Sequence, residues 1–273
     1  MIEYVLWISV ALLTISALVP KIYKIHKVIG GLGWGVFSIH WAYQPLHYIE
    51  IGDFVNVGLT ISLSMFCIFL AYTMIKEYST GYDNGSSIDV TSMATTATAI
   101  GSLFYFPFAY LPALNTWIIA TVTKNVVWVL EVLNVPAQLV DWDLIALNGY
   151  KVRIILACTA IESIALFSGL ISSVKAPTKR LATAFMLSVP VIYALNIVRD
   201  VFVVVAYGEQ WFGPESFEIA HHMIAKIGSG IALFVIAYAV LKILPELLDL
   251  IEGLWKLVAE QAQSILQRIA GKQ

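Results

Sequence analysis

The chain has 273 residues, of which 59% are hydrophobic and 12% are charged, and its formal net charge is −2. A soluble domain is about 45–50% apolar and about 25% charged, so this chain has too little polar surface for a water-exposed body. The composition predicts an integral membrane protein, and the missing basic surplus argues against nucleic acid as a partner. Both cysteines, Cys67 and Cys158, lie in apolar stretches, which favours free thiols over a disulfide.

Seven stretches are long and apolar enough to cross a bilayer as helices, each needing roughly 20 residues. Their approximate ranges are 2–19, 30–49, 53–75, 91–111, 155–173, 181–206 and 219–243. The first stretch follows an acidic start at Glu3 and precedes no cleavage site of small residues, so we expect it to be retained. The sequence therefore predicts an all-α membrane protein of about seven transmembrane helices.

Two further segments have mixed character. Residues 112–150 begin with a proline and interrupt their apolar runs with polar residues, so we expect them to lie in the outer membrane interface. Within this segment, Asn148-Gly149 indicates the turn of a small hairpin. In the tail, residues 246–273, apolar residues recur at helical spacing, which predicts an amphipathic helix at a membrane surface.

Lysine and arginine are distributed unevenly between the loops, and cytoplasmic loops carry the excess of these residues. The loops after the first and fifth stretches and the tail are basic, whereas residues 44–53 and 207–218 contain neither residue type. We therefore expect the amino terminus outside and the carboxyl terminus inside. The basic residues that set this orientation are Lys21, Lys24, Lys27, Lys175, Lys179, Arg180, Lys242, Lys256, Arg268 and Lys272.

Arg199 is the outstanding ionisable residue within a predicted span. A charged side chain there costs roughly 2.5–3.5 kcal/mol on insertion scales and marks a functional candidate. Arg199 lies nine residues before Gly208, roughly 13 Å below the membrane boundary. It is either a functional cation or one half of a structural ion pair with Asp200 or another helix. Asn196, one turn earlier on the same helix face, is placed to hold the guanidinium.

Cys158 opens the fifth span and has polar neighbours. A cysteine in an apolar setting is usually a small buried hydrophobe, which is how we interpret Cys67. Cys158 differs because Thr159, Glu162 and Ser163 follow it, and in a helix Glu162 would share its face at i+4. A thiol beside a cation and a base is a candidate nucleophile.

His221 and His222 open the seventh span, where a histidine is either an interfacial anchor or a proton carrier. His221 would share a helix face with Ala225, Gly228 and Ala232, small residues that permit close helix packing. His222 would share a face with Lys226. Because spans five and seven run inward and span six runs outward, these histidines, Cys158 and Arg199 all fall in the outer half of the membrane.

The sequence resembles the exosortase/archaeosortase family of membrane-embedded cysteine transpeptidases. Three motifs carry the resemblance: Ala157-Cys158-Thr159-Ala160-Ile161, Asn196-Ile197-Val198-Arg199-Asp200 and Ala220-His221. The order Cys, Arg, His and the loop 206–212 are most similar to the archaeal branch of the family, and the similarity covers roughly residues 90–245. It implies three parts: helices one to three (1–90), a catalytic core with its interfacial segment (91–245) and a cytoplasmic tail (246–273).

The resemblance also implies a substrate class. Such enzymes recognise secreted proteins with a carboxyl-terminal PGF-CTERM-type signal, which comprises a short motif, a transmembrane helix and a basic tail. They cleave next to the motif and pass the new carboxyl end to a membrane lipid, here an archaeal phospholipid. The implied roles are Cys158 as nucleophile, Arg199 as stabiliser of the oxyanion or thiolate, and His221 as base and acid. Some members have an arginine at the third position, so His222 and Lys226 stay open as basic partners.

No cofactor or metal is expected, because the sequence has neither a clustered His/Cys/Asp set nor a glycine-rich phosphate loop. Two rival interpretations remain. A multi-pass transporter or channel could use Arg199 to bind an anionic substrate, but it would need a polar path on both sides of the membrane. A structural membrane subunit would leave Arg199 unexplained unless a partner helix supplied a carboxylate.

Overall fold

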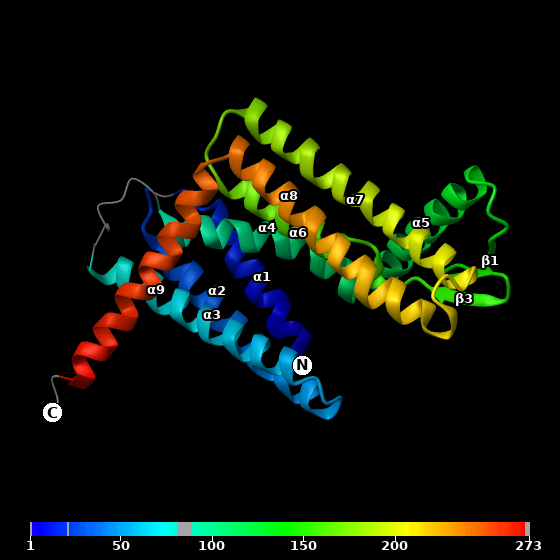
Figure 1. Ribbon diagram of the computed structural model, residues 1–273. Helices are drawn as coiled ribbons and strands as arrows, with labels where there is room; N and C mark the ends of the chain where they lie inside the picture. The colour runs from blue at the N-terminus through cyan, green and yellow to red at the C-terminus, as the bar shows by residue number, and fades with distance from the viewer. Residues whose placement is uncertain (1, 21, 81–88, 271–273) are drawn as a thin grey trace. The chain divides into compact units, whose positions relative to one another are not determined.

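The computed structural model describes residues 2–20, 22–80 and 89–270. The chain is mostly helical, and it contains one small sheet (Figure 1). Lys21 and Lys272, which entered the orientation argument, lie outside the described residues. In chain order the elements are α1 (Ile2–Leu18), α2 (Ile25–Glu50), α3 (Phe54–Thr80), α4 (Val90–Tyr110), α5 (Pro112–Val132), β1 (Gln138–Asp141), β2 (Leu144–Leu147), β3 (Tyr150–Arg153), the 3-10 turn η1 (Leu156–Cys158), α6 (Ile161–Ser173), α7 (Thr178–Gly208), the 3-10 turn η2 (Gly213–Glu215), the π-helix η3 (Glu218–Ala225), α8 (Lys226–Ile243) and α9 (Glu246–Ala270).

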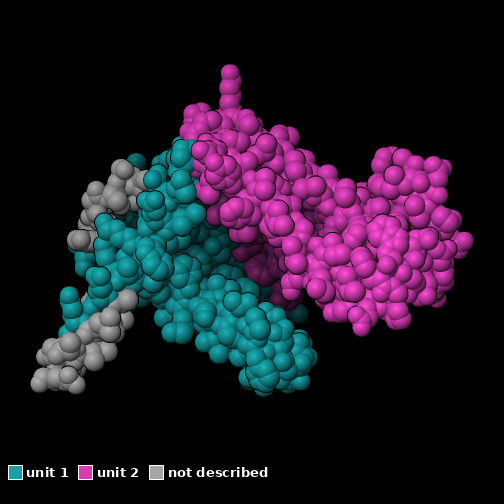
Figure 2. All heavy atoms as spheres, viewed as in Figure 1, with its two compact units in different colours: residues 1–100, 172–175, 245–273 teal, residues 101–171, 176–244 magenta. Residues whose placement is uncertain are grey.

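The contacts divide the chain into two compact units, which Figure 2 colours separately. Unit 1 consists of residues 1–100, 172–175 and 245–273, and unit 2 of residues 101–171 and 176–244. Every candidate site residue named from the sequence belongs to unit 2, so the site can be described within that unit alone.

Among the described residues, four helices are long and apolar enough to cross a membrane. Three of them coincide with predicted spans: α3, α7 and the continuous helix formed by η3 and α8. The fourth is α5, which we had expected to lie in the interface. Apolar residues outnumber the polar residues of α5 on more than one face. Val122, Val126 and Leu130 are buried, and Trp128 is an exposed apolar residue on another face.

The predicted span over residues 155–173 is wrong at its start. The helix α6 begins at Ile161 and has 13 residues, a length of about 20 Å, which falls short of the roughly 30 Å of a hydrocarbon core. Ala160 ends any continuation toward the amino terminus, because its φ of +58° is in the left-handed region. A helix of L-residues does not pass through that region.

The predicted hairpin is confirmed and belongs to a three-stranded antiparallel sheet of order β1-β2-β3. Leu147 pairs with Tyr150 across the two-residue turn Asn148-Gly149, and both turn residues have positive φ, at +51° and +86°. This is the geometry of a type I′ turn, which matches the twist of the strands. The sheet adds a β element to the expected all-α fold.

The sheet is fixed to the carboxyl-terminal end of α7 (Figure 1). The Asn148 side chain donates hydrogen bonds to the Gly208 carbonyl oxygen (3.2 Å) and to Glu209 Oε1 (2.8 Å). Leu147 lies so close to Gly208 that a Cβ there would meet its side chain at 2.5 Å. Only glycine permits this approach.

The tail forms the expected amphipathic helix, α9. Leu247 and Leu250 are buried, whereas Ile251 and Trp255 on another face are exposed. Gly253 lies against Val90, where a Cβ would meet the valine side chain at 2.4 Å. The helix therefore packs within unit 1 through one face and leaves apolar residues such as Ile251 and Trp255 exposed.

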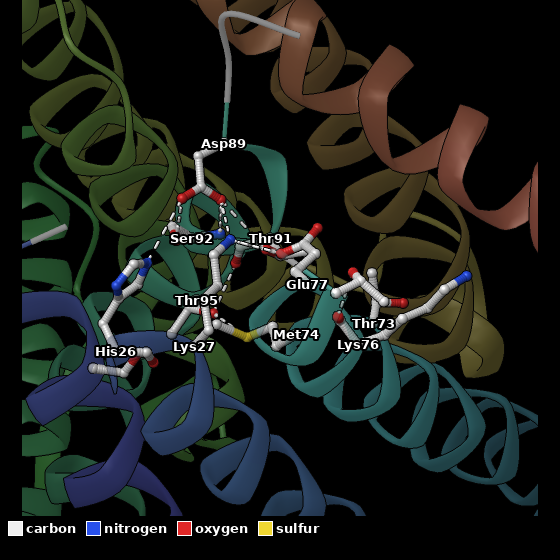
Figure 3. A network of polar contacts seen from close by, with 12 residues as sticks. His26, Lys27, Thr73, Met74, Lys76, Glu77, Asp89, Thr91, Ser92 and Thr95 are labelled. Carbon is white, nitrogen blue, oxygen red and sulfur yellow. Dashed lines mark hydrogen bonds and ion pairs between the residues drawn. The ribbon is translucent and has the colours of Figure 1, made fainter. Parts of the chain in front are cut away.

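Unit 1 contains a polar network that joins α2, α3 and the start of α4 (Figure 3). Lys27 Nζ donates to Glu77 Oε2 (2.7 Å), Asp89 Oδ1 (2.5 Å) and Thr91 Oγ1 (2.7 Å). The Lys27 side chain is 11% exposed and that of Glu77 is 16% exposed. Burial alone would raise the pKa of Asp89, but the charge and hydrogen bond of Lys27 lower it well below its usual range.

Replacing Lys27 with methionine should destabilise unit 1 by about 3 kcal/mol, because two mostly buried carboxylates lose their counter-ion. Lys24→Met, at the exposed position directly before α2, is the matched control. The thermal unfolding midpoint of the detergent-solubilised protein near pH 7 measures both. Since the folded pKa of Asp89 is lowered, the ion pair stabilises above the ordinary carboxyl pKa, and its contribution is lost as pH falls toward the folded pKa. Equal midpoints for the two variants would contradict this account.

Candidate active site

Cys158 ends the 3-10 turn η1, directly after the strand β3, and it is 8% exposed. The turn is held by its own hydrogen bonds: Cys158 N donates to the Ile155 carbonyl (2.8 Å), and Thr159 Oγ1 donates to the Leu156 carbonyl (2.7 Å). Around it lies one apolar cluster built from α5, the sheet and α7. Burial of the turn in this cluster gives the thiol a defined position.

The expected helical relation between Cys158 and Glu162 is wrong. Cys158 precedes the left-handed residue Ala160, and the helix containing Glu162 begins after it, so the i,i+4 geometry does not apply. Glu162 is exposed and its Oε1 accepts a hydrogen bond from Tyr105 Oη (3.4 Å). A non-glycine residue at positive φ stores strain of about 1–3 kcal/mol, and such residues concentrate at functional sites.

Asn196 connects the turn to α7. Its Nδ2 donates a 2.7 Å hydrogen bond to the Cys158 carbonyl oxygen, across 38 residues of sequence, and lies 3.2 Å from Asp200 Oδ2. Its Oδ1 accepts a 3.3 Å hydrogen bond from Arg199 Nη1. One amide therefore contacts the main chain of the cysteine, the guanidinium and a carboxylate. Because Asn196 is 7% exposed, these hydrogen bonds replace its contacts with water.

Arg199 is the common neighbour of the candidate residues. Its Nε lies 3.9 Å from Asp200 Oδ1, and the Asp200 side chain is 3% exposed, so a carboxylate partly compensates the buried cation, as the ion-pair interpretation expected. The guanidinium also interacts electrostatically with the Cys158 thiol and with His221. A guanidinium has five N–H donors, so it can serve several of these groups at once.

The thiol of Cys158 is not activated by this environment alone. Burial disfavours the charged thiolate most strongly and the charge of Asp200 disfavours it as well, whereas the Arg199 guanidinium favours it. Nucleophilic attack from this position requires a base that accepts the proton.

The two histidines lie in the π-helix η3, where the wider turn changes which residues share a face. His221 is half-buried and stacks on Phe217, with ring centroids 5.2 Å apart. His222 is exposed and its Nε2 lies 3.8 Å from Glu218 Oε2. Lys226 is exposed as well. Of the three, His221 is the half-buried residue, and it interacts electrostatically with Arg199.

A cavity of about 420 Å³ lies beside Arg199 and Asn196, between η1, α6, α7 and the η3–α8 helix. Arg199, Asn196, Glu162 and Ser163 line its polar part. The rest of the wall is apolar or small, and it includes Ala225, Gly228 and Ala232, the face that we had predicted for His221. In Figure 1, the end of α7 and the start of the η3–α8 helix lie together at one end of unit 2.

Sequence reasoning missed two features of this site. The hydrogen bond from Asn196 to the Cys158 carbonyl has no sequence signal, because it joins a helix to an irregular turn. The positive φ of Ala160 also has no sequence signal, because alanine is a strong helix former. Within the described residues, no group of three or more His, Cys, Asp or Glu side chains is placed to hold a metal ion.

Comparison with known proteins gives the class. The model of the transmembrane exosortase family (Exosortase_EpsH) matches residues 3–243, so the chain belongs to this family of membrane proteins. No solved structure matches.

Two curated relatives are similar to this chain over most of their length. The chain is 26% identical over 261 residues to archaeosortase A of Haloferax volcanii, covering 82% of this chain and 83% of the relative. It is 25% identical over 256 residues to archaeosortase A of Natronomonas pharaonis, covering 82% and 78%. The family and these relatives support a processing enzyme that acts on proteins.

The contacts of Cys158 predict how its reactivity depends on pH. In a Cys67→Ala background, alkylation of Cys158 by iodoacetamide should rise with pH as the thiolate forms. Arg199→Gln removes a positive charge that favours the thiolate, so the midpoint of alkylation should move to higher pH. Intact-mass analysis over time measures the rate. A midpoint that falls or stays unchanged in Arg199→Gln would show that the guanidinium does not act on the thiol.

Proposed function

We propose that this protein is a membrane-embedded cysteine transpeptidase that cleaves the carboxyl-terminal sorting signal of secreted surface proteins and transfers them to a membrane lipid. The proposed signal is of the PGF-CTERM type: a short motif, a transmembrane helix and a basic tail. The observation that carries the proposal is the hydrogen-bonded set of Cys158, Asn196 and Arg199. It brings a buried thiol, a fixed turn and a cation together in a family of protein-processing enzymes.

In the proposed reaction, Cys158 Sγ attacks the scissile carbonyl carbon while His221 accepts the thiol proton. Negative charge develops on the carbonyl oxygen, and the Arg199 guanidinium stabilises it. The C–N bond then breaks, and the amine of the leaving signal takes the proton from His221. The products of this half-reaction are a thioester on Cys158 and a free transmembrane signal peptide.

The supporting residues take secondary roles in this proposal. Asn196 positions both the guanidinium and the turn that carries the nucleophile. His221 is preferred to His222 and Lys226 as base because both of these are exposed, and His222 pairs with Glu218. Glu162 lies at the rim of the same cavity and could contact the substrate.

The proposed arrangement in the cell membrane is multi-pass, with about seven spans, the amino terminus outside and the carboxyl terminus inside. Basic loops support this orientation, and it brings the site near the extracellular face, where secreted substrates arrive. Residues 91–245 form the proposed catalytic core, with 112–150 on its outer side. The transporter alternative is not favoured, because the family and the curated relatives are processing enzymes by name.

The nucleophile is tested by two cysteine variants in cells that carry a surface protein with a PGF-CTERM-type signal. Cys158→Ala should abolish removal of the signal, because no other group can form the thioester, while protein level and membrane insertion stay normal. Cys67→Ala, another buried free cysteine, should process normally. Immunoblotting of the mature surface protein reads out both. Normal processing by Cys158→Ala would end the transpeptidase proposal.

Arg199→Lys tests the role of the planar fork as distinct from its charge. Lysine keeps the positive charge but cannot give two parallel hydrogen bonds to one oxyanion. We expect about a 100-fold loss of processing rate, within the range for removal of an oxyanion donor. A transporter that uses only the charge of Arg199 would retain part of its activity in this variant.

A further inference from the structure

The cavity beside Arg199 has a form that the cleavage chemistry alone does not require. Its wall runs along α7 from Ile192 to Phe202 and along the continuous η3–α8 helix from Ile224 to Ile236, which corresponds to about 15 Å and 18 Å of helix rise. The volume of about 420 Å³ is therefore spread along a slot parallel to two helices. A helix of 20 residues, about 10 Å wide, is too large for this slot, whereas a single slender chain fits its dimensions.

Hydrogen bonding decides which kind of slender chain can enter. An extended peptide brings an N–H and a carbonyl group with each residue, and each must find a partner in an apolar environment. The backbone groups of α7 and α8 are used within their own helices. Beyond Arg199 and Asn196, the α7 and α8 walls supply one polar side chain, Ser229. The deep part of the slot cannot satisfy a peptide, but a hydrocarbon chain needs no partners.

The two ends of the slot differ in charge. Its Arg199 end carries the guanidinium, the Asn196 amide and the polar groups of Glu162 and Ser163. Its other end, near Ile192 and Ile236, is apolar. An amphiphile with an anionic headgroup and a long apolar chain matches this gradient, because the phosphate can contact Arg199 while the chain extends away from it.

We propose that this slot binds one hydrocarbon chain of a membrane phospholipid and holds the lipid headgroup beside Cys158. Gly228 and Ala232 of α8 provide the width, since a Cβ on Gly228 meets no atom within 4 Å. Lipid binding in the slot is inferred from the cavity itself, whereas the role of this lipid as the acceptor rests on the proposed function. In that role, a headgroup amine or hydroxyl attacks the thioester carbonyl of Cys158. A C–N or C–O bond forms, the C–S bond breaks, and the nucleophile's proton passes through His221 to the departing thiolate.

Two glycines of α8 make a matched test. Gly228 lines the slot and Gly230 does not, and a Cβ on either would meet no atom within 4 Å. Gly228→Leu and Gly230→Leu therefore make the same change in size and helix propensity, but the first fills the slot. Ala232→Leu is a second slot-filling variant. Thermal unfolding midpoints equal to that of Gly230→Leu establish that the slot-filling proteins are folded.

The measurement is photolabelling of the full-length protein in phospholipid vesicles. The probe is a phosphatidylethanolamine analogue with a diazirine in the middle of one chain, and mass spectrometry maps the labelled residues. We expect labelling of slot residues such as Leu195 and Leu233 in the wild type and in Gly230→Leu. Both slot-filling variants should lower it by about fivefold or more, because their new side chains occupy the space of the chain. Cys158→Ala should label like the wild type.

Equal labelling of the slot residues in all variants, or no labelling of them in the wild type, would overturn the proposal that the slot binds lipid. A second overturning result is loss of Cys158 acylation in Gly228→Leu with unchanged lipid labelling, because the slot would then bind the substrate peptide. The expected effect of Gly228→Leu on activity is loss of lipid transfer. Failure of the proposed function alone would appear as normal processing by Cys158→Ala, whatever the labelling shows.

Discussion

Arg199 carries a positive charge inside a helix whose neighbouring residues are mainly apolar, and such a charge persists only with partners. Asn196 and Asp200 supply them from the same helix, at 3.3 Å and 3.9 Å. Asn196 in turn donates to the Cys158 carbonyl, so the group that holds the cation also holds the turn of the thiol. The need to satisfy one half-buried guanidinium thus arranges the proposed nucleophile, its oxyanion partner and the adjacent cavity.

The same constraint explains the irregular backbone around the site. A regular helix through residues 155–173 would carry Cys158 on a helix face with its carbonyl already hydrogen-bonded within the helix. The turn η1 and the left-handed Ala160 free that carbonyl for Asn196. The sheet and α5 surround the turn with apolar side chains such as Ile145 and Val126, so strain at one residue is offset by packing around it. On the other side, the π-helix brings His221 within the electrostatic field of Arg199.

Much of this fold could be predicted from the sequence because hydrophobic length and turn chemistry are local signals. The helices α3, α7 and α8 followed from apolar length, and the hairpin followed from Asn148-Gly149. The contact between Arg199 and Asn196 followed from helical spacing. The start of α6 was wrong because Ala160 has a strong helix propensity and only its tertiary setting places it at positive φ. The hydrogen bond of Asn196 to Cys158 joins two irregularly related segments, which no periodicity reveals.

The most direct test of the account is to trap the covalent intermediate. The purified protein is incubated with a synthetic peptide that contains the cleavage motif and the following apolar segment, quenched in acid and digested for mass spectrometry. The account predicts an adduct of the amino-terminal substrate fragment on Cys158 that neutral hydroxylamine removes, since a thioester is cleaved by this nucleophile. Cleavage of the peptide without an adduct on Cys158, or with the adduct on another residue, would contradict it.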